Sequence, residues 1–224
     1  SRNPPYKWAG RGAYSYDYES WTNYNSVNFP KLKGIKNISS IAINPFDENH
    51  AFGGSFGYGV IEFLNGEIKD VFDNENSALK TIPEYGEGYI LVEDLAFDFD
   101  QNLWIISSQV SDPVYVKTPG DDIEEFELDR SFGLDDHLRK ILITQYGHIW
   151  TIHNKEENFG FFVFDNLGNE KRFDLLNAEG NKEQRRINCF AEDNDGQIWI
   201  GTDEGIYIFY NPESVFSNYT LIGQ

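Results

Sequence analysis

A tryptophan within an aliphatic run returns at nearly equal intervals along this chain. Trp104, Trp150 and Trp199 each follow a polar turn, and Phe52 takes the same place in a more divergent copy. The spacings between these four aromatic residues are 52, 46 and 49 residues. Self-similarity at a period of about 40 to 50 residues is typical of arrays of one repeated structural unit. The sequence therefore predicts a fold that is built from repeats.

Every copy has similar strand-like flanks. An apolar run precedes each aromatic residue, at 38–43, 91–97, 138–143 and 187–191. A second run follows it, at 60–63, 114–116, 161–164 and 206–209, and three copies add a weaker run, at 67–72, 123–128 and 170–173. These runs are rich in β-branched and aromatic residues and are separated by Gly, Asn and Asp turns, which is typical of short antiparallel strands. Repeated four-stranded units of this length predict an all-β protein, a β-propeller.

Counting the copies predicts how the chain 1–224 is divided. We expect four full four-stranded blades, at about 31–80, 81–130, 131–180 and 181–224, behind a partial blade in 1–30. A propeller ring closes by pairing strands from both ends of the chain. The tail 217–224 offers one weak strand, whereas closure here would need two. We therefore expect a fragment of a larger propeller rather than a closed five-bladed ring.

Charge and hydropathy exclude several classes of function. With 18 basic and 37 acidic residues, the formal net charge is −19. Such a surface repels phosphate backbones and anionic lipid, so we expect no nucleic-acid partner. No apolar run approaches the roughly 20 residues of a membrane-spanning helix, so no transmembrane segment is expected. The chain begins at Ser1, without an initiator Met, which indicates a removed targeting segment or an excised piece.

One turn has the beginning of a calcium-loop pattern. Asp193, Asp195 and Gly196 fit its first positions, and Glu204 falls at its twelfth. However, Trp199 lies inside the supposed loop, in a β-type run. A hairpin turn, in which Asp bonds local amides and Gly accepts a positive φ, is the favoured interpretation.

The histidines and the cysteine give no site either. His148 and His153 are five residues apart, on opposite faces of a strand, so they do not form a pair of metal ligands and are expected at the surface or in turns. The single cysteine, Cys189, lies in a first strand and is expected to be a buried, inert thiol. No paired carboxylates and no nucleophile, phosphate-loop or zinc motif occur. We therefore predict no catalytic residue, no cofactor and no metal.

Two groups of residues are candidates for ligand binding. The N-terminal region is rich in aromatic residues, namely Tyr6, Trp8, Tyr14, Tyr16, Tyr18, Trp21 and Tyr24. Strand alternation puts Tyr14, Tyr16 and Tyr18 on one face, where they either pack between blades or stack on sugars. An anionic glycan would need basic residues, and the candidates are Arg2, Lys7, Arg11, Arg185 and Arg186. The acidic runs at 121–122, 124–125 and 135–136 are interpreted as solvated turns and strand faces.

The last copy resembles a known repeat. The segment 187–206 is similar to the two-component regulator propeller repeat, of the form I-x-x-x-x-E-D-x-D-G-x-I-W-I-G-T-x-x-G-I. The similarity is close there, partial around Trp104 and Trp150, and poor around Phe52. A narrower resemblance, to the PorZ-like propeller proteins of type IX secretion systems, is carried by 21–26, 41–45, 57–66, 95–104 and 205–216.

The narrower resemblance implies a function. Such proteins are secreted by Bacteroidetes, carry two propellers and a sorting domain, and act at the cell surface in a complex that attaches cargo to anionic lipopolysaccharide. This chain would then be most of the second propeller, a non-catalytic module that binds protein partners or a glycan. The general repeat equally implies an alternative, the periplasmic sensor propeller of a hybrid two-component system that binds an oligosaccharide. A propeller lyase or glycosidase is a third hypothesis, which paired carboxylates in a pocket would favour.

Overall fold

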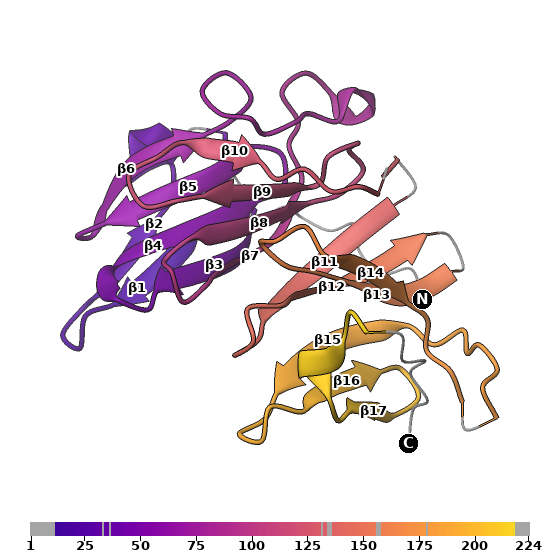
Figure 1. Ribbon diagram of the computed structural model, residues 1–224. Coiled ribbons are helices and arrows are strands. Elements are labelled where there is room, and N and C mark those ends of the chain that lie inside the picture. Colours follow the sequence, from indigo (N-terminus) through magenta and orange to yellow (C-terminus); the bar gives the residue numbers. More distant parts are fainter. Residues whose placement is uncertain are drawn as a thin grey trace, which may run out of the picture.

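The structure, a computed structural model, describes residues 12–32, 34–35, 37–130, 132–133, 136–155, 158–177 and 179–217. These residues form antiparallel sheets that follow one another along the chain (Figure 1). The sheets fan out in an arc, with the hairpin β1–β2 near one end and β15–β17 at the other (Figure 1). The predicted all-β propeller architecture is therefore confirmed. No helix in the described ranges is long and apolar enough to cross a membrane.

Within each sheet the strands pair in sequence order. The first sheet contains β3 (Ile38–Asn44), β4 (Asp47–Ser55), β5 (Gly59–Leu64) and β6 (Glu67–Phe72). The second contains β7 (Val92–Phe97), β8 (Leu103–Ser107), β9 (Val114–Lys117) and β10 (Ile123–Glu125). The third contains β11 (Asp136–Ile143), β12 (Ile149–Lys155), β13 (Asn158–Phe164) and β14 (Glu170–Phe173). The fourth contains β15 (Ile187–Glu192), β16 (Ile198–Thr202) and β17 (Ile206–Phe209).

The two ends of the chain are less regular. A hairpin of β1 (Ala13–Tyr16) and β2 (Trp21–Tyr24) precedes the first sheet, as expected for a partial blade. Three 3-10 turns also occur in the described residues, η1 (Pro30–Leu32), η2 (Pro83–Tyr85) and η3 (Pro212–Ser214). The fourth sheet has three strands in the described residues. Residues 218–224, where most of the predicted tail strand falls, lie outside them.

The repeated aromatic residue packs each sheet onto the next. Trp104 of β8 is 2% exposed and contacts Phe164 of the third sheet, with ring centroids 5.8 Å apart. Trp150 of β12 is fully buried and contacts Phe209 of the fourth sheet at 5.1 Å. Each such ring removes a large apolar area from water, which stabilises the stack of sheets.

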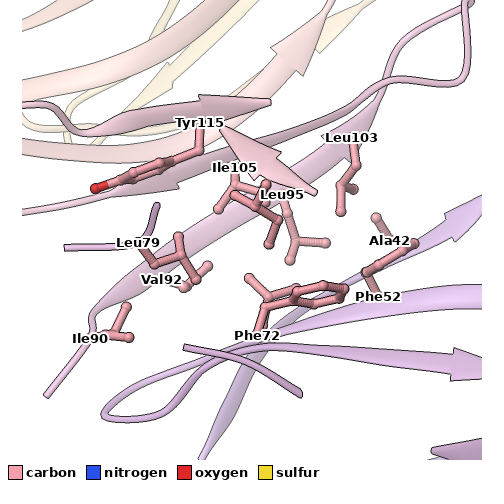
Figure 2. Close-up of a cluster of buried hydrophobic side chains, with 12 residues drawn as sticks. Ala42, Phe52, Phe72, Leu79, Ile90, Val92, Leu95, Leu103, Ile105 and Tyr115 are labelled. Atoms are coloured by element: carbon pink, nitrogen blue, oxygen red, sulfur yellow. The ribbon is translucent and has the colours of Figure 1, made fainter. Parts of the chain in front are cut away.

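Phe52 does the same at the first junction. Figure 2 shows this core, where Phe52 and Phe72 of the first sheet lie against side chains of the second. The second sheet contributes Val92, Leu95, Leu103, Ile105, Tyr115 and Ile123. On the other face of the first sheet, Tyr24 of the hairpin packs against Phe63 at 5.0 Å. Each of the first three sheets is thus covered on both faces by its chain neighbours.

Trp199 differs from the other repeated aromatic residues and is 39% exposed. Along β16, Ile198 and Ile200 alternate with Trp199 and face the third sheet. The indole therefore projects from the opposite face of the fourth sheet, where a following sheet would pack in a propeller. Its burial depends on that neighbour and not on its own repeat.

The turns before Trp104 and Trp199 hold the ring by a specific bond. The Asp98 carboxylate accepts the indole N–H of Trp104 at 2.8 Å, and Asp193 accepts that of Trp199 at 2.7 Å. The third copy has Thr144 in the place of the aspartate. Among the described residues, none accepts a bond from the buried indole nitrogen of Trp150.

This difference predicts unequal costs for the same substitution. Trp104→Phe and Trp150→Phe remove the same atoms from equally buried sites, but only the first breaks a bond to a carboxylate. We expect Trp104→Phe to lower the free energy of unfolding by about 1 to 2 kcal/mol more than Trp150→Phe. Urea unfolding curves with unchanged slopes would measure the difference. An equal or larger loss in Trp150→Phe would contradict it.

Candidate functional site

An open cavity of about 610 Å³ lies where the first sheet is connected to the second. Its walls come from the β4–β5 turn, from η1 and from the long connection between β6 and β7. Three tyrosines line it, Tyr58, Tyr85 and Tyr89. Loops at the ends of propeller strands vary without disturbing the sheets, which makes such a place suitable for a binding site.

Local backbone geometry positions these rings. Gly57 has a φ of 110°, and a Cβ there would lie 3.3 Å from the Tyr89 ring, so a glycine allows the ring to pack flat on the turn. Tyr85 ends the 3-10 turn η2, and its ring centroid lies 5.3 Å from that of Tyr89. Tyr58 leans over Gly34, where a Cβ would approach the ring to 3.0 Å. The aromatic wall is therefore built by the turns themselves.

The cavity is acidic as well as aromatic. Asp73, Glu75 and Glu87 line it, and Lys31 supplies the cation. The Lys31 ammonium already donates to the carbonyls of Ile68 and Lys69, at 3.1 and 2.8 Å. Burial raises the pKa of the Tyr89 phenol, which keeps it a neutral hydroxyl. This set of hydroxyls, carboxylates and ring faces suits a neutral or cationic ligand better than an anion.

The predicted tyrosines lie on the N-terminal hairpin, apart from this cavity. Tyr14 and Tyr16 are 55% and 51% exposed and share a face of β1 with the partner residues Asn23 and Trp21. Tyr18 lies beyond the strand, in a turn with a φ of 72°, so the expected alternation does not extend to it. Its side chain is 89% exposed. A role of this face in ligand binding stays a prediction.

The predicted basic residues are at the other end of the array. Arg185 precedes β15 and is paired with Glu183 at 2.6 Å and with Glu204 at 3.6 Å, so its charge is already compensated. The backbone N–H of Arg186 donates to Asp203. The structure does not bring these residues together with the hairpin tyrosines. Tyr6, Trp8, Arg2, Lys7 and Arg11 lie outside the described residues.

The turn beginning at Asp193 is a hairpin turn, as expected. Its carboxylate accepts the amides of Asp195 and Gln197 in addition to the indole of Trp199. These bonds, above all the one from the indole, hold the pKa of Asp193 below its usual range. Among the described residues, no group of three His, Cys, Asp or Glu side chains is arranged to hold a metal ion.

The histidines differ from expectation. His148 and His153 are 9% and 0% exposed and therefore are not surface groups. Strand parity does separate them, but both faces of a propeller sheet are covered, so either face is buried. His153 lies 2.6 Å from a carboxylate oxygen of Asp136 and accepts a bond from Arg172 at 3.1 Å. Asp136, expected in a solvated acidic run, is buried as part of this chain of bonds.

Cys189 is exposed, which contradicts the expected burial. Its neighbour Phe190 packs toward the third sheet, and a bulge between Ile187 and Cys189 shifts the register. The thiol therefore shares the free face of the fourth sheet with Trp199.

Sequence reasoning missed a recurring polar position on the innermost strands. On the first strand of each sheet, one residue pairs with the repeated aromatic residue of the second strand. Three residues before it, the four sheets have Ser39, Glu93, Arg139 and Asn188. A bulge lies at or next to this position in every sheet. Glu93 and Arg139 form an ion pair of 3.6 Å between neighbouring sheets, and burial raises the pKa of Glu93. Aligning the repeats would have revealed this position, because an aliphatic residue precedes it in every copy, namely Ile38, Val92, Leu138 and Ile187.

The comparisons with known proteins agree with the fold. Residues 182–204 match the family model "Two component regulator propeller", the repeat that the sequence resembles. The structure of PorZ, an essential bacterial surface component of the type-IX secretion system of Porphyromonas gingivalis, superimposes with a TM-score of 0.82 at 23% identity. That match covers 94% of this chain and 30% of PorZ. No curated protein matches the sequence.

A second structure shares the architecture. It is described as the extracellular domain of a hybrid two component system from B. thetaiotaomicron, with a TM-score of 0.60 and 17% identity. The match covers 95% of this chain and 26% of that domain's chain. This chain thus spans less than a third of either structure, and both likenesses show a shared propeller fold.

The buried histidines predict a dependence of stability on pH. Burial lowers the pKa of His153, although Asp136 opposes this, and burial likewise lowers the pKa of His148. The unfolded chain then takes up protons that the folded chain does not, so the free energy of unfolding declines as pH falls below about 6.5. We expect this decline to be smaller in His153→Gln when thermal unfolding is followed from about pH 7.5 to about pH 5.

Comparing His153→Gln with the wild type controls for the other groups that titrate in this pH range. Burial raises the pKa of Glu93, which acts in the opposite sense as the pH falls, but it does so equally in both. Parallel pH profiles for the wild type and His153→Gln would contradict the prediction.

Proposed function

We propose that this chain is a non-catalytic, ligand-binding propeller of a protein at the surface of a Bacteroidetes cell. Support comes from the likeness to PorZ and to the extracellular domain of a two component system. The observation that carries the proposal is the tyrosine-lined cavity between the β4–β5 turn and the β6–β7 connection. Its rings form an aromatic wall, and we assign its carboxylates, Asp73, Glu75 and Glu87, to ligand binding.

The chemistry of the cavity favours one class of ligand. Aromatic faces pack against the apolar faces of sugar rings, and carboxylates accept bonds from sugar hydroxyls. Asp73, Glu75 and Glu87 would repel an anionic lipopolysaccharide, and Lys31 is already engaged. A neutral oligosaccharide therefore suits this cavity better, which agrees with the sensor type of function. If the whole protein handles an anionic glycan, another surface would bind it.

A scaffold role for protein partners is the second candidate. The exposed face of the hairpin, with Tyr14, Tyr16 and Trp21, favours it. Aromatic residues are enriched at protein interfaces, and contiguous exposed apolar area indicates a contact surface. Both functions are compatible, since the hairpin and the cavity are separate.

Calorimetric titration with neutral oligosaccharides tests the proposal, with maltohexaose and cellohexaose as the first probes. We expect Tyr58→Ala and Tyr85→Ala each to weaken the binding of the active sugar by about fivefold to tenfold, since an aromatic contact contributes about 1 kcal/mol. Binding should change little between low and high salt, because the ligand carries no charge.

Tyr16→Ala is the matched control, an equally exposed tyrosine outside the cavity, and should bind as the wild type. The proposal would be wrong if lipopolysaccharide bound in a salt-dependent manner and the cavity variants left that binding unchanged. Loss of sugar binding in Tyr16→Ala alone would instead move the site to the hairpin.

A further inference from the structure

The first sheet departs from the other three at one position. On the third strand of each sheet, one residue pairs with the repeated aromatic residue of the second strand. It is Val116, Val163 and Ile208 in the second, third and fourth sheets, but Glu62 in the first. The Glu62 side chain is only 2% exposed. Burying a carboxylate costs free energy unless its oxygens are paired, so a charge in an aliphatic position needs a reason.

Only one of the two carboxylate oxygens of Glu62 is bonded to described residues. Its Oε1 atom lies 2.8 Å from His50 Nε2 and accepts a bond from Lys69 Nζ at 2.9 Å. Among the residues that the structure describes, none bonds to Oε2. The second oxygen of a buried carboxylate is thus left as a strong acceptor at the junction of the first and second sheets.

A cavity of about 370 Å³ lies at this position. Phe52 replaces the tryptophan of the other copies and is smaller by a ring, and Asn44 stands where the second and fourth copies have the aspartate that anchors the indole. Phe52, Phe72 and Phe97 form the apolar lining. In the first repeat, a cavity that Glu62 lines is therefore found where other copies have a packed indole.

Charges of both signs surround this space. Besides Glu62, the carboxylates of Asp70, Asp121 and Asp122 line it, and Lys69 and Lys117 contribute ammonium groups. The Lys117 ammonium donates one bond to the Asp121 carbonyl, and its nitrogen lies 5.6 Å from the centre of the Phe72 ring, at the edge of the apolar lining. An ammonium group has three donors, so two remain for a ligand. A simple anion would face the carboxylates and a simple cation the lysines. A molecule with one group of each sign and an apolar body would satisfy both sets.

We propose that this junction binds a small zwitterion with an apolar body, the chemistry of a free α-amino acid. Its ammonium group would donate to Glu62, its carboxylate would accept from Lys117, and its side chain would lie against the phenylalanines. The cavity is bounded by the β3–β4, β7–β8 and β9–β10 turns. These turns are at the opposite strand ends from the tyrosine cavity, so the two sites are independent.

Titration calorimetry on the full chain tests the proposal, with L-phenylalanine as the probe. Two analogues separate the contacts, since phenethylamine lacks the carboxylate and 3-phenylpropionate lacks the amine. We expect L-phenylalanine to bind and each analogue to bind at least about tenfold more weakly, because each loses a charge-assisted bond. No binding of L-phenylalanine, equal binding of all three, or binding of a neutral sugar in their place would overturn the proposal.

Variants locate the site. Phe52→Trp restores the residue of the other repeats and should abolish binding while the urea unfolding transition stays cooperative. Trp104→Phe makes the reverse exchange in the second sheet and should bind as the wild type. Unchanged binding in Phe52→Trp would place the ligand elsewhere and overturn the assignment.

Glu62→Gln keeps the size of the side chain and removes its charge. We expect about tenfold weaker binding of L-phenylalanine and little change for 3-phenylpropionate. Because Glu62→Gln could fail to fold, Lys117→Met gives a second test that does not touch the buried carboxylate. It should weaken L-phenylalanine to the level of phenethylamine and leave phenethylamine unchanged. Equal effects of Lys117→Met on both ligands would contradict the proposed orientation.

Discussion

The packing of one large aromatic side chain into the neighbouring sheet is the interaction on which this fold depends. A four-stranded sheet of about twenty residues cannot bury both of its faces alone. Trp104 and Trp150 are enclosed because the next sheet is present, whereas Trp199, which has no next sheet within the described residues, is 39% exposed. Stability in such an array is a sum over neighbouring units. The buried ring between two units is therefore also what fixes the geometry of any site at their junction.

Departures from the repeat have local consequences that can be traced. Where the turn aspartate becomes Thr144, the indole of Trp150 is left without an acceptor among the described residues, but the core stays filled. Where tryptophan becomes Phe52, the anchoring aspartate is also absent and a cavity is found beside a buried carboxylate. Natural proteins break local rules mainly where function requires it. We infer that the second departure is of that kind, because a buried charge lowers stability and adds nothing to packing.

The period of the aromatic residue was enough to predict the strands, their antiparallel order and the packing of sheet on sheet. Burial was less predictable, because it depends on neighbours that a single repeat does not contain. Cys189 and Trp199 are exposed at the free face of the last described sheet, and His153 is buried because both faces of an inner sheet are covered. The tyrosine cavity was missed for another reason. Tyr58 and Tyr85 belong to a turn and a connection, which the repeat does not constrain.

Glu62 shows what the sequence does contain when its copies are aligned by strand register. An alignment of the repeats puts Glu62 at the same position as Val116 and Val163, so the sequence alone shows that this residue differs. The sequence does not show whether the glutamate is buried, since a solvated strand face would also carry one. Only the structure places it at 2% exposure, with one oxygen paired and the other facing a cavity. The regular repeats form rigid junctions, and the divergent first repeat adds a buried carboxylate and a cavity. A recognition site in such a fold is therefore to be sought where the repeat is weakest, at the junction that its aromatic residue fills least.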